Sequence, residues 1–148
     1  MSDSAVILGA DVADDDRAAV LAGLVAYNTQ HGYPWPWRDL EFVLRDQSGL
    51  VVGGILAETN AGWCFIKGLW VAEDHRRRGY GRQLLTAVED AARARGCIGV
   101  FLDTYEFQAR PFYERFGYRV FGTLHDMPPG GAKHYLAKRL DEPLTSAR

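Results

Sequence analysis

The chain has 148 residues, of which 47% are hydrophobic, and its 17 basic and 19 acidic residues leave a formal net charge of −2. This length and apolar content suit one domain with a real core, so the composition excludes a disordered tail and a small disulfide-stapled scaffold. The near-neutral charge balance is not typical of a nucleic-acid-binding protein.

The first part of the chain predicts a strand, a helix and an aromatic loop. Ala5–Leu8 is a short apolar run that predicts a first strand. Apolar side chains spaced between Val20 and Asn28 predict a helix at about 14–31, with three aspartates at its start. Two prolines within residues 31–37 end that helix, because proline cannot continue it.

The rest of the chain predicts strands interleaved with two further helices. The expected helices are about 79–95 and 108–116, and the expected strands are about 40–46, 50–58, 63–72, 100–102, 118–124 and 134–140. Residues 63–72 are apolar at nearly every position, as in a central strand that is covered on both faces. Gly68 inside this strand indicates a bulge or a close backbone approach.

This order of elements predicts an α/β fold of the mixed α+β type, in which helices pack on the faces of one mixed sheet. The strand–helix–strand unit around 79–95 is expected to be a right-handed parallel crossover. The chain has no internal repeat and no low-complexity linker. We therefore expect a single domain over residues 1–148, with a loose tail from about residue 142.

Residues 71–85 end the buried strand, turn through arginines and glycines, and open an amphipathic helix. Glycines allow close backbone approach, and the free N–H groups at a helix start favour an anion. The cationic donors beside them are Arg76, Arg77, Arg78 and Arg82. The segment predicts a pyrophosphate-binding loop, although a solvated arginine run that caps a helix is the simpler alternative. Gly79–Leu84 lacks the third small residue of a dinucleotide fingerprint, and no Walker phosphate loop occurs.

Two motifs in this sequence resemble those of the Gcn5-related N-acetyltransferase (GNAT) superfamily. Arg76–Gly81 matches its Arg/Gln-x-x-Gly-x-Gly/Ala signature, and Leu69–Val71 is similar to the Leu-x-Val run before it. Gln108–Tyr118 is similar to the family segment Ala-x-x-Phe-Tyr-Glu-x-x-Gly-Phe. The motifs stand in the family's order and at its spacing, so the resemblance covers the chain from about 63 to 118.

The resemblance implies a GNAT-like sheet of about seven mostly antiparallel strands, flanked by about four helices, with a splayed pair of central parallel strands. Acetyl-CoA would lie in the V-shaped opening between the strands near 63–72 and 98–104. Backbone groups from Leu69 to Val71 would hold its pantetheine arm, and amides from Arg77 to Arg82 its pyrophosphate. The residues that would contact acetyl-CoA are Leu69, Trp70, Val71, Arg76, Arg77, Arg78, Gly79, Tyr80, Gly81, Arg82, Gln108, Phe112 and Tyr113. Gln108 departs from the Asn of many relatives.

The implied reaction is direct transfer of the acetyl group to a primary amine in a ternary complex. Tyr113 matches the family's general acid, whose phenolic proton would go to the departing sulfur. Lys67 stands where many relatives have a Glu, so the general base is open. The candidates are Glu106, Asp103 and a water chain to bulk solvent, and Glu106 is the one that we name as catalytic.

The acceptor side of the implied site falls on the loop after the first helix, which shapes the acceptor pocket in the resembled family. Its predicted substrate-binding residues are Tyr33, Trp35, Trp37 and Asp103. Stiff prolines and aromatic walls favour a small-molecule amine. A peptide or protein amine and a non-catalytic acyl-CoA sensor are the alternatives. The resemblance also implies a possible homodimer.

The first residues of the chain and its two cysteines bear on the cellular compartment in which we expect the protein. Met1–Ser4 carry no positive charge, no long apolar run follows, and no stretch approaches the roughly 18 apolar residues of a membrane span. Cys64 and Cys97 stand in apolar contexts and predict buried, reduced thiols. The histidines do not cluster at metal-ligand spacing. We expect a cytoplasmic protein without metal, membrane or nucleic-acid partners.

Overall fold

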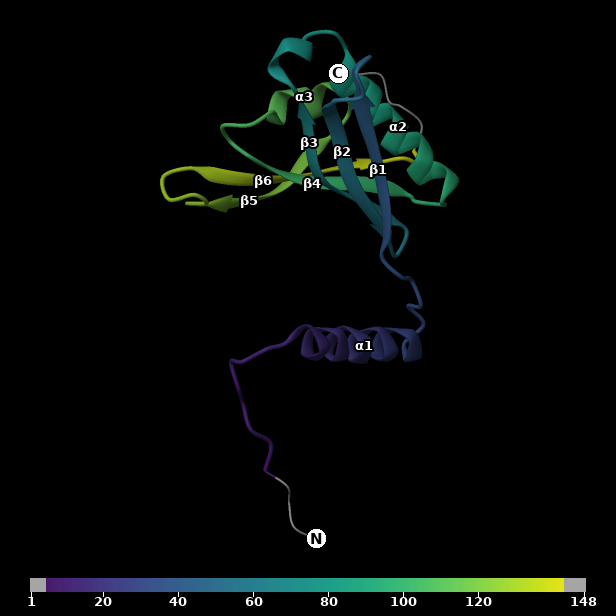
Figure 1. Ribbon diagram of the computed structural model, residues 1–148, viewed down its shortest axis with the longest axis vertical. Helices are drawn as coiled ribbons and strands as arrows, with labels where there is room; N and C mark the ends of the chain where they lie inside the picture. The colour runs from purple at the N-terminus through teal and green to yellow at the C-terminus, as the bar shows by residue number, and fades with distance from the viewer. Residues whose placement is uncertain (1–4, 143–148) are drawn as a thin grey trace. The chain divides into compact units, whose positions relative to one another are not determined.

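The computed structural model describes residues 5–142, so the predictions for Met1–Ser4 and for nearly all of the tail lie outside it. Its elements are α1 (Asp14–Gln30), β1 (Arg38–Arg45), β2 (Val51–Asn60), β3 (Trp63–Val71), the single turn η1 (Glu73–His75), α2 (Tyr80–Ala94), β4 (Gly99–Tyr105), α3 (Arg110–Arg115), β5 (Arg119–His125) and β6 (Ala132–Arg139) (Figure 1). Contacts divide the chain into two compact units, up to Pro36 and from Trp37 onward.

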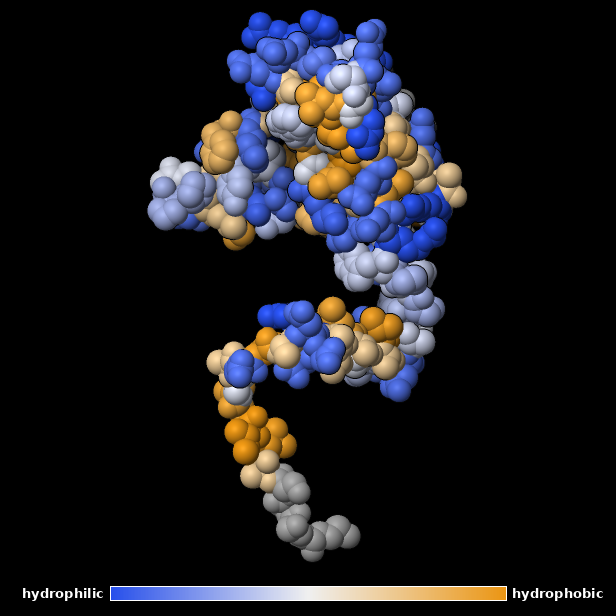
Figure 2. Space-filling model, in the orientation of Figure 1, coloured by the Kyte–Doolittle hydropathy of each residue, from blue (hydrophilic) through white to orange (hydrophobic). Residues whose placement is uncertain are grey.

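The first unit contains α1 and no strand among its described residues. The prediction of a strand at Ala5–Leu8 was therefore wrong, because an extended segment needs a hydrogen-bonded neighbour and this unit supplies none. The helix prediction is confirmed, and the Asp16 carboxylate accepts a hydrogen bond from the Ala13 amide at 2.8 Å. Figure 2 shows hydrophobic side chains on α1, where Val20 and Leu21 are more than half exposed.

The second unit is built on one six-stranded sheet in the order β1-β2-β3-β4-β6-β5. Only β3 and β4 run parallel, and every other pair of neighbours is antiparallel. The mixed, mostly antiparallel sheet is thus confirmed, with six strands where about seven were expected. The described residues form three α-helices rather than about four, since residues 31–37 carry two prolines and form no helix.

Helix α2 covers one face of this sheet and forms the core with it. Its buried residues recur at helical spacing, from Leu84 and Leu85 through Val88 to Ala92. The sheet residues buried in the same cluster are Leu40, Ile55, Ala57, Cys64, Ile66, Val100, Leu102 and Leu136. Both cysteines are free and buried, as the sequence predicts. The helix stops before Gly96, whose φ of +82° is the left-handed conformation of a helix end.

The two central parallel strands separate partway along their length. Their register runs from Trp63 opposite Gly99 to Ile66 opposite Leu102, although β3 continues to residue 71 and β4 to residue 105. The separation begins where β3 carries an extra residue, Lys67, relative to β2. The bulge indicated by Gly68 is therefore present, and the implied splay is confirmed.

A buried ionic network joins α2 to the last part of the sheet. The Tyr118 hydroxyl donates a hydrogen bond to Oε2 of Glu89 at 2.9 Å, and Nζ of Lys138 donates to Oε1 at 2.9 Å. All three side chains are shielded, and burial beside the Glu89 carboxylate raises the pKa of Tyr118. The network fixes the segment after α3 and strand β6 against the same helix.

We predict that Glu89→Gln lowers the free energy of unfolding by about 3 kcal/mol, because the buried Lys138 ammonium loses its counter-ion. Urea unfolding followed by circular dichroism measures this change. Asp90→Asn is the matched control, since the neighbouring Asp90 carboxylate is exposed and forms a surface ion pair with Arg93, so its loss should change stability by less than about 0.5 kcal/mol. Equal effects of the two substitutions would contradict the prediction.

Candidate functional site

The start of α2 presents backbone N–H groups that have no partner within the helix. Its first intrahelical hydrogen bond runs from the Gln83 amide to the Gly79 carbonyl at 3.0 Å, so the amides of Tyr80, Gly81 and Arg82 lie in the open first turn. Gly79 reaches this turn with a φ of +80°, which glycine adopts without strain. Open amides and the helix dipole together make a site for an anion.

Four arginines lie in the turn before α2 and in its first residues. Arg76 is fixed to the end of β3, because its Nε donates to the Val71 carbonyl at 2.9 Å. Within residues 5–142, the side chains of Arg77, Arg78 and Arg82 make no hydrogen bond or ion pair with the protein. Three uncompensated guanidinium groups beside a helix start match the charge of a pyrophosphate.

The second sequence motif packs against the first at Gly81. A Cβ atom on Gly81 would stand 3.2 Å from Cζ and 3.3 Å from Cε2 of Phe112 on α3. The glycine therefore lets α3 approach the start of α2, which brings the two predicted acetyl-CoA contact segments together. The following residue on α3 is Tyr113, whose ring also packs edge-on against Phe112.

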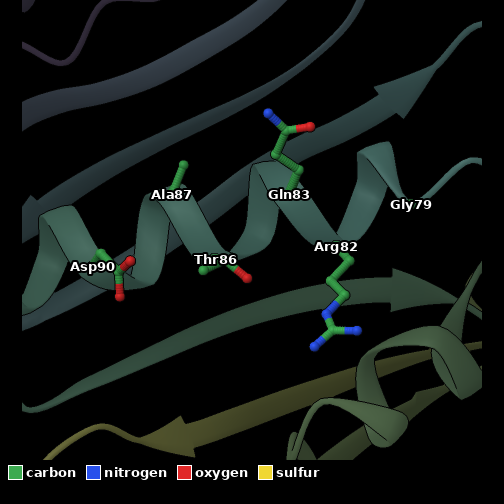
Figure 3. Close-up of a pocket in the computed structure, with 6 residues that line it drawn as sticks. All are labelled: Gly79, Arg82, Gln83, Thr86, Ala87 and Asp90. Atoms are coloured by element: carbon green, nitrogen blue, oxygen red, sulfur yellow. The ribbon is translucent and has the colours of Figure 1, made fainter.

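A groove continues from the open helix start along the outside of α2 (Figure 3). Its volume is about 500 Å³, and it is lined by Gly79, Arg82, Gln83, Thr86, Ala87 and Asp90, which share one face of the helix. In Figure 3 the Arg82 side chain extends away from the axis of α2. A ligand whose phosphates bind at the helix start therefore has room for further groups beside α2.

The separated part of β3 leads directly to this anion site. Leu69, Trp70 and Val71 pair with β2 on one side, but the register with β4 has already ended at Ile66. Their backbone groups on the β4 side are therefore available to an extended ligand. Since the carboxyl ends of β3 and β4 lie at this edge, residues 69–71 lead along the chain to the turn at residues 76–82.

Tyr113 combines a buried ring with an accessible hydroxyl. The residue is 7% exposed, and burial raises its pKa to about 12. The part of the chain that the structure describes gives the hydroxyl no hydrogen-bond partner, yet the hydroxyl is not among the fully shielded polar atoms. It therefore keeps its proton and is free to donate it.

Two carboxylates at the end of β4 differ in their partners. Oδ1 of Asp103 lies 3.2 Å from Nζ of Lys133, and the hydrogen bond between them raises the pKa of Lys133. Glu106 is 64% exposed at its side chain, and its Oε1 lies 3.7 Å from Nε2 of His134. Glu106 is therefore the carboxylate that a lysine does not neutralise.

The remaining predicted site residues fall in other places. Oε1 of Gln108 accepts hydrogen bonds from the Tyr105 amide at 2.8 Å and the Thr104 hydroxyl at 3.2 Å, so only its amide nitrogen is open to a ligand. Tyr33 and Trp35 belong to the first unit, where their ring centroids lie 5.3 Å apart, and Trp37 begins the second. Their contact with an acceptor stays a prediction.

Sequence reasoning missed Glu58 and His134. Lys67 lies 3.6 Å from Oε2 of Glu58 and 4.0 Å from Oδ1 of Asp39, so the lysine at the bulge is paired with carboxylates on β2 and β1. His134 on β6 lies opposite Thr104 of β4. Both placements depend on strand register, for which the sequence carries no local signal.

The described residues contain neither a metal-binding cluster nor a membrane-spanning helix. No group of three or more histidine, cysteine or acidic side chains in residues 5–142 is arranged to hold a metal ion. The helices of that part of the chain are all too short or too polar to cross a membrane.

Comparison with known proteins identifies the architecture. The model of the acetyltransferase (GNAT) family matches residues 12–118. The acetyltransferase Atu2258 of Agrobacterium fabrum is 36% identical over 130 residues, which cover 87% of this chain and 95% of that relative. A crystal structure of an acetyltransferase from Bacillus cereus superposes with a TM-score of 0.80 at 30% identity, over 94% of this chain and 99% of that one.

A relative with a specified acceptor also matches. Blasticidin-S acetyltransferase of Streptomyces morookaense is 38% identical over 95 residues, which cover 64% of this chain and 70% of that relative. The family match contains both motifs and the two separated strands. The chain belongs to the acetyltransferase (GNAT) family.

Proposed function

We propose that this protein transfers the acetyl group of acetyl-CoA to a primary amine of a small molecule, by direct attack within a ternary complex. The observation that carries the proposal is the open, arginine-lined start of α2 at the mouth of two separated parallel strands. This arrangement offers an anion site and an extended backbone edge in series, which are the two parts that a pantetheine diphosphate needs.

The backbone of β3 and the start of α2 would hold the cosubstrate. Amides of Tyr80, Gly81 and Arg82 would bind the pyrophosphate, supported by the unpaired guanidinium groups beside them. The free edge from Leu69 to Val71 would align the pantetheine arm and polarise the thioester carbonyl. Phe112, packed against Gly81, closes the site from the side of α3.

The transfer forms one bond and breaks another, and three protons move. The amine nitrogen attacks the thioester carbon to form the C–N bond, and the C–S bond then breaks. Tyr113 gives its phenolic proton to the departing sulfur, since its hydroxyl is protonated and has no competing partner in the described part of the chain. The attacking nitrogen then gives its extra proton to the Tyr113 phenolate, which restores the acid. An unperturbed ammonium has a pKa of about 10.4, so the acceptor must first lose a proton to a base.

Glu106 is the base in this proposal. Its carboxylate is exposed at the end of β4 and has no lysine or arginine bound to it in residues 5–142. Asp103, by contrast, is bound by Lys133 and would lose that ion pair if it took a proton. Asp103 is better suited to attract the cationic amine than to deprotonate it.

The acceptor class is supported by the relative named for blasticidin-S, a small molecule. Tyr33, Trp35 and Trp37 supply three aromatic rings close together in the chain, and aromatic faces attract ammonium groups. We propose that these three residues bind the acceptor. Two protein side chains account for the proton transfers in this scheme.

The decisive experiment measures CoA thiol release with acetyl-CoA and a panel of small amines, together with a peptide that has a free amino terminus. We expect release with at least one small amine and formation of its N-acetyl product by mass spectrometry. Binding of acetyl-CoA by calorimetry without turnover of any amine would favour a non-catalytic sensor. Acetylation of the peptide alone would contradict the small-molecule part of the proposal.

We predict that Gly79→Ala weakens acetyl-CoA binding about tenfold. Alanine at a φ of +80° is strained by roughly 1–2 kcal/mol, and the amides of the α2 start would shift to relieve that strain. Gly49→Ala is the matched control, since Gly49 has a φ of +88° in the turn between β1 and β2, outside the site. Calorimetric titration with acetyl-CoA compares the two, and equal affinities would contradict the role of the helix start.

We predict that Tyr113→Phe lowers kcat about a hundredfold with little change in acetyl-CoA affinity, because only the donated proton is lost. Since the pKa of Tyr113 is raised to about 12, wild-type activity at pH 9 should not suffer from ionisation of this group. Steady-state kinetics and calorimetry measure the two effects. Unchanged turnover of the Phe variant would exclude Tyr113 as the acid.

A further inference from the structure

His134 has one buried ring nitrogen that lacks a hydrogen-bond partner. The residue is 6% exposed, and its Nδ1 lies 2.9 Å from the hydroxyl oxygen of Thr123 on β5. Among the fully shielded side-chain nitrogen and oxygen atoms of residues 5–142, Nε2 of His134 alone has no partner. Buried polar atoms in native proteins are nearly always bonded, so an orphaned nitrogen calls for a functional explanation.

The group nearest to this nitrogen is the carboxylate that we propose as base. Oε1 of Glu106 is 3.7 Å from Nε2, which is outside hydrogen-bond range but within reach of a small side-chain rotation. Glu106 is held beside His134 by the sheet, since its amide donates to the Ala132 carbonyl at 3.0 Å and His134 lies opposite Thr104. The exposed carboxylate can move, whereas the buried imidazole is fixed.

Neighbouring charged groups are already engaged with one another. Lys133 binds Asp103, and Lys138 binds Glu89. Arg110, at the start of α3, binds Glu114 at 2.6 Å. His134 is therefore the nearby side chain that can form a hydrogen bond with the Glu106 carboxylate. The other histidine on this hairpin, His125, is exposed at the end of β5.

We infer that His134 is a positioning residue for Glu106, an inference that rests on the proposed function. With the Thr123 hydroxyl donating to Nδ1, Nε2 carries the ring proton and donates it to Oε1 of Glu106 after a small rotation of the carboxylate. When an N–H bond of the acceptor ammonium breaks, the new O–H bond forms on the other carboxylate oxygen of Glu106, Oε2. The imidazole orients the carboxylate without itself touching the acceptor or acetyl-CoA.

The test uses two substitutions that separate the ring nitrogens. His134→Asn places an amide near the position of Nδ1 and removes Nε2, while His134→Gln extends an amide to the position of Nε2. We expect the Asn variant to lose about tenfold in kcat with an unchanged KM for acetyl-CoA, and the Gln variant to recover much of that loss. Thr123→Val, which frees the ring from its anchor, should lower kcat in the same direction.

A double-mutant cycle distinguishes positioning from structural damage. In the Glu106→Gln background, His134→Asn should cost little further kcat, because there is no carboxylate left to orient. Thermal unfolding reports any loss of stability separately, and His125→Asn is the matched control, expected to keep wild-type kinetics.

Three outcomes would overturn the inference. They are wild-type kcat in the Asn variant, an equal tenfold loss in the Glu106→Gln background, and a Gln variant no faster than the Asn variant. Absence of wild-type turnover with every amine would instead contradict the proposed function, and this inference with it.

Discussion

The end of the hydrogen-bonded register between β3 and β4 at Ile66 and Leu102 is the constraint on which the site depends. Parallel strands that stayed paired would use the backbone groups of residues 67–71 on both sides and leave no edge for a ligand. The extra residue Lys67 disturbs the pairing of β3 with β2 at the level where the pairing with β4 ends. A bulge bends its strand, so one inserted residue turns a closed sheet into one with a binding edge.

The same separation determines where the other functional groups lie. The chain leaves β3 at Val71 and re-enters α2 at Tyr80, so the helix start must lie near the open end of the strand. It leaves β4 at Tyr105 and enters α3 at Arg110, which places α3 at the same edge. Gly81 then allows the aromatic side of α3 to meet the start of α2. Anion site, strand edge and Tyr113 thus follow from one topology.

Local patterns allowed much of this to be predicted, and non-local register explains what was missed. The helices at 79–95 and 108–116, and the turn that leads into the first of them, depend on neighbouring residues and were predicted correctly. Ala5–Leu8 has the composition of a strand, but a strand also requires a partner, which composition does not show. The pairing of Lys67 with Glu58 and the placement of His134 opposite Thr104 require knowledge of which strands are adjacent.

Solvent exposure separates the two proposed proton-transfer roles more sharply than residue type does. Burial raises the pKa of Tyr113 to about 12, so its proton is still present when the C–S bond breaks in the proposed reaction. Glu106 needs the opposite setting, because a base must be ionised before the amine arrives and must release its proton to solvent afterwards. Its exposed side chain meets both needs, at the cost of a loosely held carboxylate. A fixed imidazole at 3.7 Å offsets that looseness without burying the charge, so a histidine is better suited to this position than a lysine, which would neutralise the base.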